Sequence, residues 1–216
     1  MASQNKYELY YFNVAGLSRT IRILLETVNA DYTLKHPQSW ESEKPDTIFG
    51  RLPILYVTKP DGKRVEIAES NAISRYLARE HGLLGDDSDE TAFVESVIDS
   101  LNDLLATALH HVFFAKEEEK KAAGKKTLQE SAEKLIPYHE RLLKKNSSNG
   151  HYLKDKFTVA DIHAFAILGL LQNVLGEEVF QTIVNSEKTP ALVKLNEAVK
   201  STKAVQRLTE QNFFSS

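Results

Sequence analysis

The sequence predicts an α+β protein in which a small part with strands and helices precedes an all-helical part. Short apolar runs alternate with helical patterns up to about residue 84. After the Gly- and Asp-containing segment 82–88, every periodic stretch has apolar side chains at helical spacing. The 216 residues are 42% hydrophobic and include no Cys, so the core must form without disulfides or thiolate metal ligands.

The first three elements predict a β-α-β unit. Residues 7–12 are rich in aromatic side chains and predict a strand. Residues 19–29 place apolar side chains at i, i+3, i+4 and i+7, which predicts an amphipathic helix. A second short strand is predicted at 32–36. Because this unit needs a crossover connection, its two strands are expected to be parallel.

A hairpin and a helix complete this part. The Pro-Asp-Gly sequence at 60–62 separates two strand patterns at 54–58 and 64–68, where a tight hairpin needs such residues. A helix predicted from Ser70, as its N-cap, to about residue 81 ends before Gly82. The order β-α-β, long loop, β-β-α is that of a thioredoxin-like domain. We therefore expect this domain at 1–82, a linker at 83–88 and an all-helical domain at 89–216.

The helical part begins with a long helix, predicted at about 89–116 from its apolar seam. The charged run 116–126 is expected to be a solvated helix end and loop. A helix at 127–145 follows, with a kink at Pro137.

Two further helix starts are visible. Thr158 and Asp161 form a Thr-x-x-Asp capping signal before the apolar helix 162–175. Thr189-Pro190 predicts another helix with Pro in its first turn.

Charge excludes some functions. Residues 1–84 carry 11 basic and 10 acidic side chains and residues 85–216 carry 16 and 20, so neither part has the basic surface that nucleic acids require. No apolar run reaches 18 residues and the N-terminus does not resemble a signal peptide. We expect a cytoplasmic protein without nucleic-acid or membrane partners.

Several residues indicate a peptide-like ligand. The loop 13–18 lies where redox members of the thioredoxin-like fold keep their cysteines, so any sulfur chemistry here needs a sulfur from a ligand. The backbone of Leu52, before Pro53, can pair with an extended ligand. Glu69 and Ser70, at a helix start, can hold the amine and the carboxylate of an amino acid, although Ser70 could equally be a plain N-cap.

These residues belong to a wider pattern, which includes Tyr-Phe-Asn at 11–13, Trp40-x-x-x-Lys44, Phe-Gly-Arg-Leu-Pro at 49–53, Glu-Ser-Asn-Ala-Ile at 69–73 and Asp99-x-x-x-Asp103. With these blocks in this order, the chain resembles the cytosolic glutathione transferases and, within them, the sigma class. The resemblance implies a homodimeric enzyme that uses glutathione as co-substrate, without a metal. It also implies attack of the thiolate on an apolar electrophile, or glutathione-dependent isomerisation or peroxide reduction.

The resemblance implies a role for each matching residue. Tyr11 would donate its hydroxyl to the glutathione sulfur. Asp103 would reach the γ-glutamyl amine in the neighbouring subunit, and Asp161 would cap a helix. The remaining glutathione-binding residues would be Trp40, Lys44 and Arg51 for the glycyl carboxylate, Leu52 and Pro53 for the cysteinyl unit, and Glu69 and Ser70 for the γ-glutamyl group.

A hydrophobic pocket for the second substrate is expected between the domains, with candidates Val14, Ala15, Leu105, His110 and Phe114. His110 and His111 face about 100° apart on a helix, so they cannot both line one pocket. Two histidines are also too few for a zinc site.

Two rivals to Tyr11 stay open. Tyr10 precedes it on the strand, and Ser18 stands where some transferase classes carry a serine donor. An arginine that usually supports the tyrosine–thiolate pair is missing from Ala15-Gly16-Leu17, and Arg19 is the nearest substitute. That departure leaves an alternative function: a non-catalytic carrier or structural protein that keeps the fold.

Overall fold

The computed structural model describes residues 5–146 and 149–215. Its contacts divide the chain into two units. The first combines the residues up to Gly82 with those from Thr202 onward, and the second runs from Leu83 to Ser201. The residues after 201, expected in the helical domain, thus group with the first unit.

Ion-pair and aromatic contacts explain this grouping. Helix α9 (Lys203–Glu210) packs on α1 (Arg19–Thr27). There Nε of Arg207 lies 2.7 Å from the carboxylate of Glu26. The nearly buried Arg22 donates to Gln211 at 3.1 Å and lies 4.4 Å from the centre of the Phe213 ring. Contacts between residues this far apart in the chain leave no mark on local periodicity.

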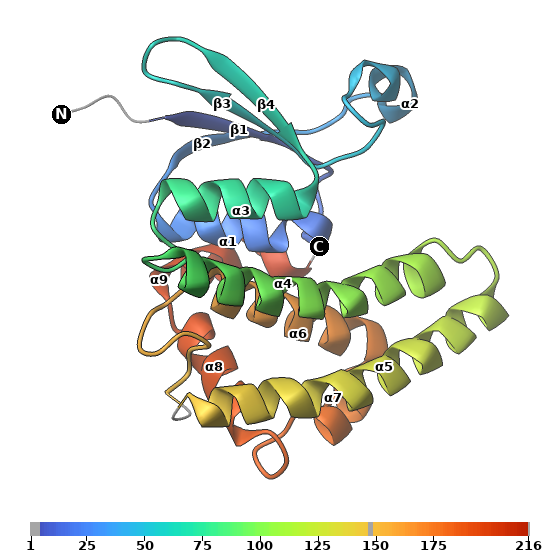
Figure 1. Cartoon of the computed structure of the whole chain (residues 1–216). Coiled ribbons are helices and arrows are strands. Elements are labelled where there is room, and N and C mark those ends of the chain that lie inside the picture. Colours follow the sequence, from blue (N-terminus) through green and yellow to red (C-terminus); the bar gives the residue numbers. More distant parts are fainter. Residues whose placement is uncertain (1–4, 147–148, 216) are drawn as a thin grey trace. The chain divides into compact units, whose positions relative to one another are not determined.

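The first unit contains a four-stranded sheet with the order β2-β1-β3-β4. As predicted, β1 and β2 are parallel, whereas β3 is antiparallel to both β1 and β4. Figure 1 shows α1 and α3 side by side along one face of this sheet. The elements of the unit are β1 (Lys6–Tyr10), β2 (Asp31–Lys35), α2 (Trp40–Glu43), β3 (Ile54–Thr58), β4 (Arg64–Ala68) and α3 (Ser70–Glu80), besides α1 and α9.

The apolar patterns account for the core of this unit. Leu9 of β1 and Ile21, Leu24 and Leu25 of α1 are all 1% exposed or less, so this part of the predicted helical stripe is buried. Ile23, outside the stripe, is buried as well. The predicted hairpin is also present: the amide of Lys59 donates to the carbonyl of Lys63 at 2.8 Å.

Two details differ from the sequence-based expectations. Ser70 is the first helical residue of α3 rather than its cap, because Glu69 occupies the N-cap position. The long loop between β2 and β3 contains the short helix α2, followed by a 3-10 turn at Lys44–Asp46. A helix of four residues is too short to give a periodic signal.

The second unit is helical, and its helices are α4 (Ser88–Ala108), α5 (Glu118–Lys145), α6 (Val159–Leu175), α7 (Glu177–Ile183) and α8 (Pro190–Lys200). The first helix ends earlier than expected, in a π-helical turn at Leu109–Phe113. The charged run expected to be a helix end and loop instead forms the first turns of α5. Acidic residues suit a helix N-terminus, and Glu118 pairs with Lys121 one turn later at 2.7 Å.

Asp161 forms the predicted cap of α6 and more. It has no exposed surface. One carboxylate oxygen accepts the amide of Thr158 at 2.8 Å, and the other accepts that of Tyr152 at 2.9 Å. In turn, the Thr158 side chain accepts the backbone amide of Asp161, and the two hydrogen bonds form a capping box. The buried carboxylate therefore fixes both the helix and the loop before it.

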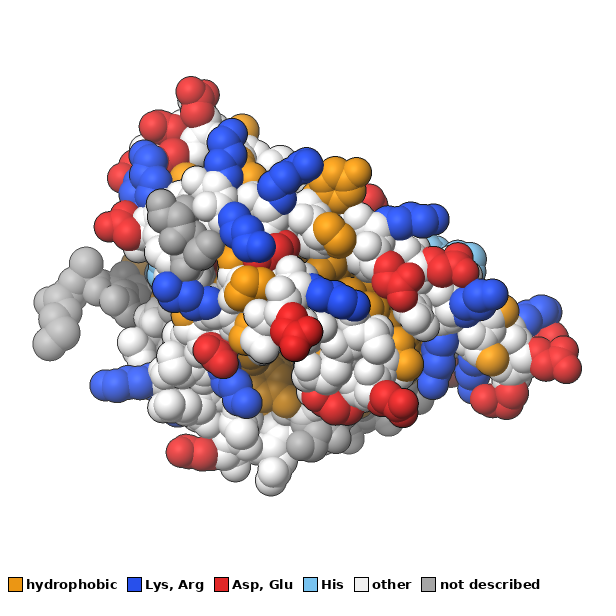
Figure 2. Space-filling view, turned by 90° about the horizontal axis from the view of Figure 1, so that it is seen from below, with side chains coloured by type: hydrophobic (Ala, Val, Ile, Leu, Met, Phe, Trp, Pro, Cys, Tyr) orange, Lys and Arg blue, Asp and Glu red, His pale blue; other side chains and the backbone are white. Residues whose placement is uncertain are grey.

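Lys and Arg side chains are interspersed with Asp and Glu over the face drawn in Figure 2. Within the described ranges, we find no helix with the length and apolar character needed to span a bilayer.

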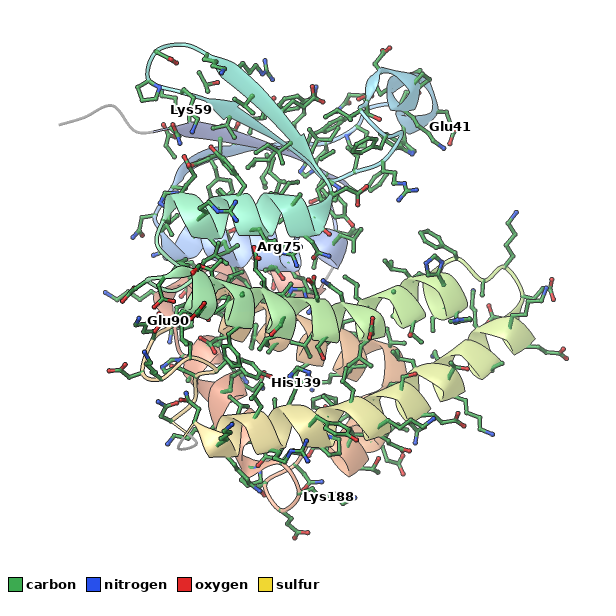
Figure 3. All side chains as sticks on the ribbon, in the orientation of Figure 1. Glu41, Lys59, Arg75, Glu90, His139 and Lys188 are labelled. Atoms are coloured by element: carbon green, nitrogen blue, oxygen red, sulfur yellow. The ribbon has the colours of Figure 1, made fainter. Side chains whose placement is uncertain are left out.

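A buried histidine connects three segments of the second unit. His139 of α5 is 3% exposed. Its Nε2 lies 3.1 Å from the hydroxyl of Ser100 on α4, and its Nδ1 lies 3.0 Å from the hydroxyl of Tyr152. Figure 3 shows this side chain between α4 and α5. Burial lowers the pKa of His139 to about 4, so the ring is neutral at physiological pH.

This histidine predicts acid sensitivity of the fold. The unfolded chain protonates the imidazole near its ordinary pKa of 6.5, and the folded chain does so only near about 4. The contribution of the neutral His139 to the free energy of unfolding is therefore fully present above pH 6.5. It is lost as the pH falls toward 4, and the total loss is roughly 3 kcal/mol. Urea unfolding at a series of pH values measures this loss.

The matched variant is His139→Gln, which keeps hydrogen-bonding atoms but does not titrate. We expect its stability to fall less steeply than that of the parent over the same pH range. Parallel curves for the two proteins would contradict the assignment.

Candidate active site

Tyr11 lies immediately after β1, and its amide still donates to the carbonyl of Lys35 on β2 at 3.0 Å. Its ring is 8% exposed. Its hydroxyl oxygen accepts the amide N–H of Leu17 at 2.9 Å. Burial raises the pKa of this phenol and the Leu17 hydrogen bond opposes the increase, so Tyr11 is protonated at neutral pH.

Gly16 makes this arrangement possible. It has a φ of +35°, and a Cβ at this position would lie 2.5 Å from the Tyr11 hydroxyl oxygen. Any other residue would push the loop away from the tyrosine. The loop that departs from the family pattern at Ala15-Gly16-Leu17 therefore brings a backbone donor to Tyr11.

The two rivals of Tyr11 have other partners. The Ser18 hydroxyl is buried and donates to the carbonyl of Ala15 at 2.8 Å. The Tyr10 hydroxyl donates to the carboxylate of Glu43 on α2. Arg19, the suggested substitute for the missing arginine, lies 5.7 Å from the centre of the Phe214 ring.

Tyr10 and Tyr11 belong to one packed group, which we call the tyrosine cluster. It consists of buried Tyr10, Tyr11, Leu52 and Ile54, with Leu17, Trp40, Tyr56 and Ala68 packed against them. Segments that lie far apart in the sequence meet here. The cluster brings four predicted site segments, those around residues 11, 17, 40 and 52, into contact.

Of the residues expected to hold the glycyl carboxylate, Trp40 lies in helix α2 and Lys44 follows this helix directly. The rings of Trp40 and Phe12 meet edge-on, with their centres 5.5 Å apart. The rings of Phe12 and Tyr11 also meet edge-on, with their centres 5.7 Å apart. Lys44 is exposed, and its side chain passes Gly50, where an added Cβ would lie 3.6 Å from Cε. The indole N–H and the ammonium group are suitable donors for an anion.

The segment around Leu52 contains a peptide bond whose isomer the sequence left open. The Leu52–Pro53 peptide bond is cis. Leu52 is nearly buried, whereas Arg51 is exposed and lies 3.8 Å from the carboxylate of Glu69. An exposed ion pair at this distance adds little stability, so both side chains can turn to a ligand.

Glu69 has an unusual backbone. Its φ of 72° is in a region that residues other than glycine rarely adopt, and such positions cluster at binding sites. Its side chain does not cap α3, and the first turn of that helix contains no acidic residue. The amides that begin at Ser70 therefore lack an anionic partner among the described residues.

The five candidates for the second-substrate pocket separate into two sets. Val14 is 44% exposed and lines a cavity of about 320 Å³ beside Tyr11 and Phe12. Ala15 has no exposed surface, so it supports the loop from within and cannot line a pocket. The other three belong to the second unit, where Leu105 is partly buried and His110 and Phe114 are exposed.

A larger cavity, of about 580 Å³, lies along α5 and α7 and contains none of the predicted site residues. In the described part of the chain, no three His, Cys, Asp or Glu side chains gather as metal ligands would.

Asp103 is exposed on α4. Its backbone carbonyl accepts the hydroxyl of Thr107 at 2.8 Å.

Sequence reasoning missed three contributors to this site. They are the Leu17 amide, the glycine that admits it and the carboxylate of Glu43. A backbone donor has no residue signature, and a glutamate in a short polar segment resembles any solvated residue. Gly16 itself was visible, but only as the residue between the two positions, 15 and 17, that depart from the family pattern.

Known proteins share both parts of this chain. The family model for the "Glutathione S-transferase, N-terminal domain" matches residues 7–79, and that for the C-terminal domain matches residues 102–212. A glutathione S-transferase of Anopheles gambiae is 33% identical over 210 residues, which are 94% of this chain and 98% of that protein.

Solved structures agree. The prostaglandin synthase D of Nilaparvata lugens has a TM-score of 0.78 at 27% identity, over 95% of this chain and 98% of its own. A sigma-class glutathione transferase of Fasciola hepatica has a TM-score of 0.79 at 25% identity, over 97% of each chain. The chain therefore belongs to the glutathione S-transferase family, as a member of sigma-like type.

Proposed function

We propose that this glutathione transferase activates the thiol of glutathione through Tyr11. The observation that carries the proposal is the hydrogen bond from the Leu17 amide to the Tyr11 hydroxyl oxygen. With its oxygen already accepting, the hydroxyl has its own hydrogen to donate to the sulfur. Donation to a thiolate is stronger than to a thiol, so the contact favours the ionised form.

The rest of glutathione would extend from Tyr11 in two directions. Trp40, Lys44 and Arg51 would hold the glycyl carboxylate. The backbone of Leu52, beside Pro53, would pair with the cysteinyl unit. Glu69 would bind the γ-glutamyl amine and the amides at Ser70 its carboxylate, which suits an uncapped helix start.

Lowering the pKa of the glutathione thiol accelerates the reaction only slightly. A free thiol has a pKa of about 8.5, so about 3% is thiolate at pH 7. Lowering this pKa by about 2 units raises ionisation roughly 25-fold, but the accompanying loss of nucleophilicity is roughly 8-fold at a Brønsted slope of about 0.45. The net gain is about threefold, so most acceleration must come from holding the two reactants together.

The second substrate would be a small apolar electrophile. Val14 and the cavity beside it support its placement near Tyr11, and Leu105, His110 and Phe114 stay candidates from the second unit. Conjugation, isomerisation and peroxide reduction need the same thiolate and differ in pocket shape. We further propose a cytoplasmic role in detoxification, as is usual for the family.

We also propose a homodimer in which Asp103 completes the glutathione site of the neighbouring subunit. Its side chain is exposed on α4, so it is accessible to a second copy. A carboxylate from the partner would pair with the γ-glutamyl amine.

The thiolate absorbance of the bound peptide tests the function. Titration of the glutathione complex from about pH 5 to 9 should give a thiol pKa well below the free value of about 8.5. Tyr11→Phe should raise that pKa by about 2 units and lower kcat about tenfold or more, with glutathione affinity nearly unchanged. Ionisation accounts for about threefold of this loss, and a sulfur no longer held toward the electrophile accounts for the remainder.

Ser18→Ala is the control, because that hydroxyl is bound to a backbone carbonyl. It should keep kcat within about threefold of the parent. Loss of activity in Ser18→Ala with normal activity in Tyr11→Phe would reverse the assignment. A bound thiol with its free pKa would favour the non-catalytic alternative.

Gly16→Ala tests the approach of the loop to Tyr11. The new Cβ would displace the Leu17 amide from the hydroxyl, so kcat/KM should fall about tenfold or more. The control is Gly62→Ala in the hairpin turn, which also has a positive φ, of 83°, but has no atom within 4 Å of an added Cβ. Equal activity in the two variants would show that the close contact is dispensable.

Asp103→Ala tests the dimeric site. Calorimetry should show weaker glutathione binding, by about 5- to 50-fold for a lost charge-assisted hydrogen bond. Ser96→Ala, two turns earlier on the same helix, should have little effect, because this exposed hydroxyl donates to the carbonyl of Phe93 at 2.7 Å. Unchanged affinity in Asp103→Ala, or a monomeric parent in sedimentation, would contradict the shared site.

A further inference from the structure

Helix α2 cannot hold its own position. It contains four residues, Trp40–Glu43, and isolated helices need about 12–15 residues to be even marginally stable in water. Yet it carries Trp40, and Lys44 follows it directly. If these two side chains are to receive a carboxylate, contacts outside the helix must hold them in place.

Glu43 supplies such contacts through both oxygens of its carboxylate. Its Oε1 accepts the backbone amides of Gln38 at 2.8 Å and of Ser39 at 2.7 Å, just before the helix begins. Its Oε2 accepts the hydroxyl of Tyr10. One carboxylate therefore closes the start of α2 and ties the helix to the end of β1.

Tyr10 is a rigid partner. It is 2% exposed and packs in the tyrosine cluster. Burial, reinforced by the hydrogen bond to Glu43, raises the pKa of Tyr10 to about 12, so its hydroxyl keeps the hydrogen that it donates. The pKa of Glu43 is lowered by its hydrogen bonds, most strongly by the one from the Ser39 amide and next by the one from the Tyr10 hydroxyl, so the carboxylate stays ionised as the acceptor. The ammonium group of Lys35 lies 4.6 Å from the centre of the Tyr10 ring.

We propose that Tyr10 and Glu43 are positioning residues for glutathione: they hold α2 where Trp40 and Lys44 meet the glycyl carboxylate. The inference rests on the proposed function. In it, two adjacent residues, Tyr10 at the end of β1 and Tyr11 directly after it, serve two different parts of one ligand. Tyr11 contacts the sulfur, and Tyr10 acts at a distance, through Glu43, on the glycyl end.

The expected signature is a loss of affinity without a loss of chemistry. A loosened α2 samples positions that cannot bind, so the apparent dissociation constant rises by the inverse of the competent fraction. Tyr10→Phe and Glu43→Ala should each weaken glutathione binding about 5- to 20-fold. The kcat at saturating glutathione and the pKa of the bound thiol should stay near those of the parent, because neither residue touches the sulfur.

The chain provides its own reporter for this experiment. Trp40 is the only tryptophan, so its fluorescence follows α2 and the bound glycyl group directly. Glutathione titrations of the parent, both single variants and the double variant give four dissociation constants. The control is Glu41→Ala, because Glu41 is exposed and Figure 3 shows it on the outer side of α2.

We expect the control to bind like the parent and the double variant to bind like Glu43→Ala alone, because both changes break the same contact. Affinities of both single variants within about twofold of the parent would overturn the proposal. So would a fall in kcat at unchanged affinity, or additive losses in the double variant.

Tyr10→Phe keeps the buried ring and removes one oxygen, so it decides the question even if Glu43→Ala fails to fold. Failure of the proposed function would look different. The parent itself would then not bind glutathione, or would bind it without lowering the pKa of the thiol.

Discussion

The packing of Tyr10 and Tyr11 at the end of β1 is the constraint on which the rest of the site depends. Consecutive residues at the end of a strand point to opposite sides, so one hydroxyl meets Glu43 and the other meets the Leu17 amide. The rings also pack with Leu52 in one buried cluster, against which Trp40 rests. Two connections, the segment that follows β1 and the segment between β2 and β3, thereby acquire fixed positions from a single strand end.

Backbone groups, rather than additional charged side chains, complete this arrangement. The departure from the family pattern at Ala15-Gly16-Leu17 removes an arginine, and Arg19 lies against Phe214. The loop brings the Leu17 amide to Tyr11, which only a glycine at 16 allows. A neutral N–H polarises a phenol less than a guanidinium does. This weaker support agrees with a mechanism in which the alignment of thiolate and electrophile contributes more than ionisation.

The sequence predicted what depends on local pattern and missed what depends on distant partners. The parallel pair β1–β2, the hairpin and the cap at Asp161 follow from periodicity and turn chemistry, and all three are present. The attachment of α9 to the first unit depends on Arg207 and Glu26, which are 181 positions apart. Likewise, the role of Glu43 requires knowing that Tyr10 lies beside it. Tyr11 is the candidate donor because its segment carries a family motif, not because its hydrogen bond was foreseeable.

The starts of α6, α8 and α3 are completed in different ways. In the second unit, buried carboxylates complete two of them: Asp161 caps α6, and Glu140 accepts the amides of Ala191 and Leu192 at the start of α8. In the first unit, α3 begins after a glutamate with a positive φ, without a side-chain cap. Because α3 begins beside the strands of the tyrosine cluster, its uncapped amides are available to an anion in the proposed glutathione site. The γ-glutamyl carboxylate of glutathione has the charge and the geometry to supply it.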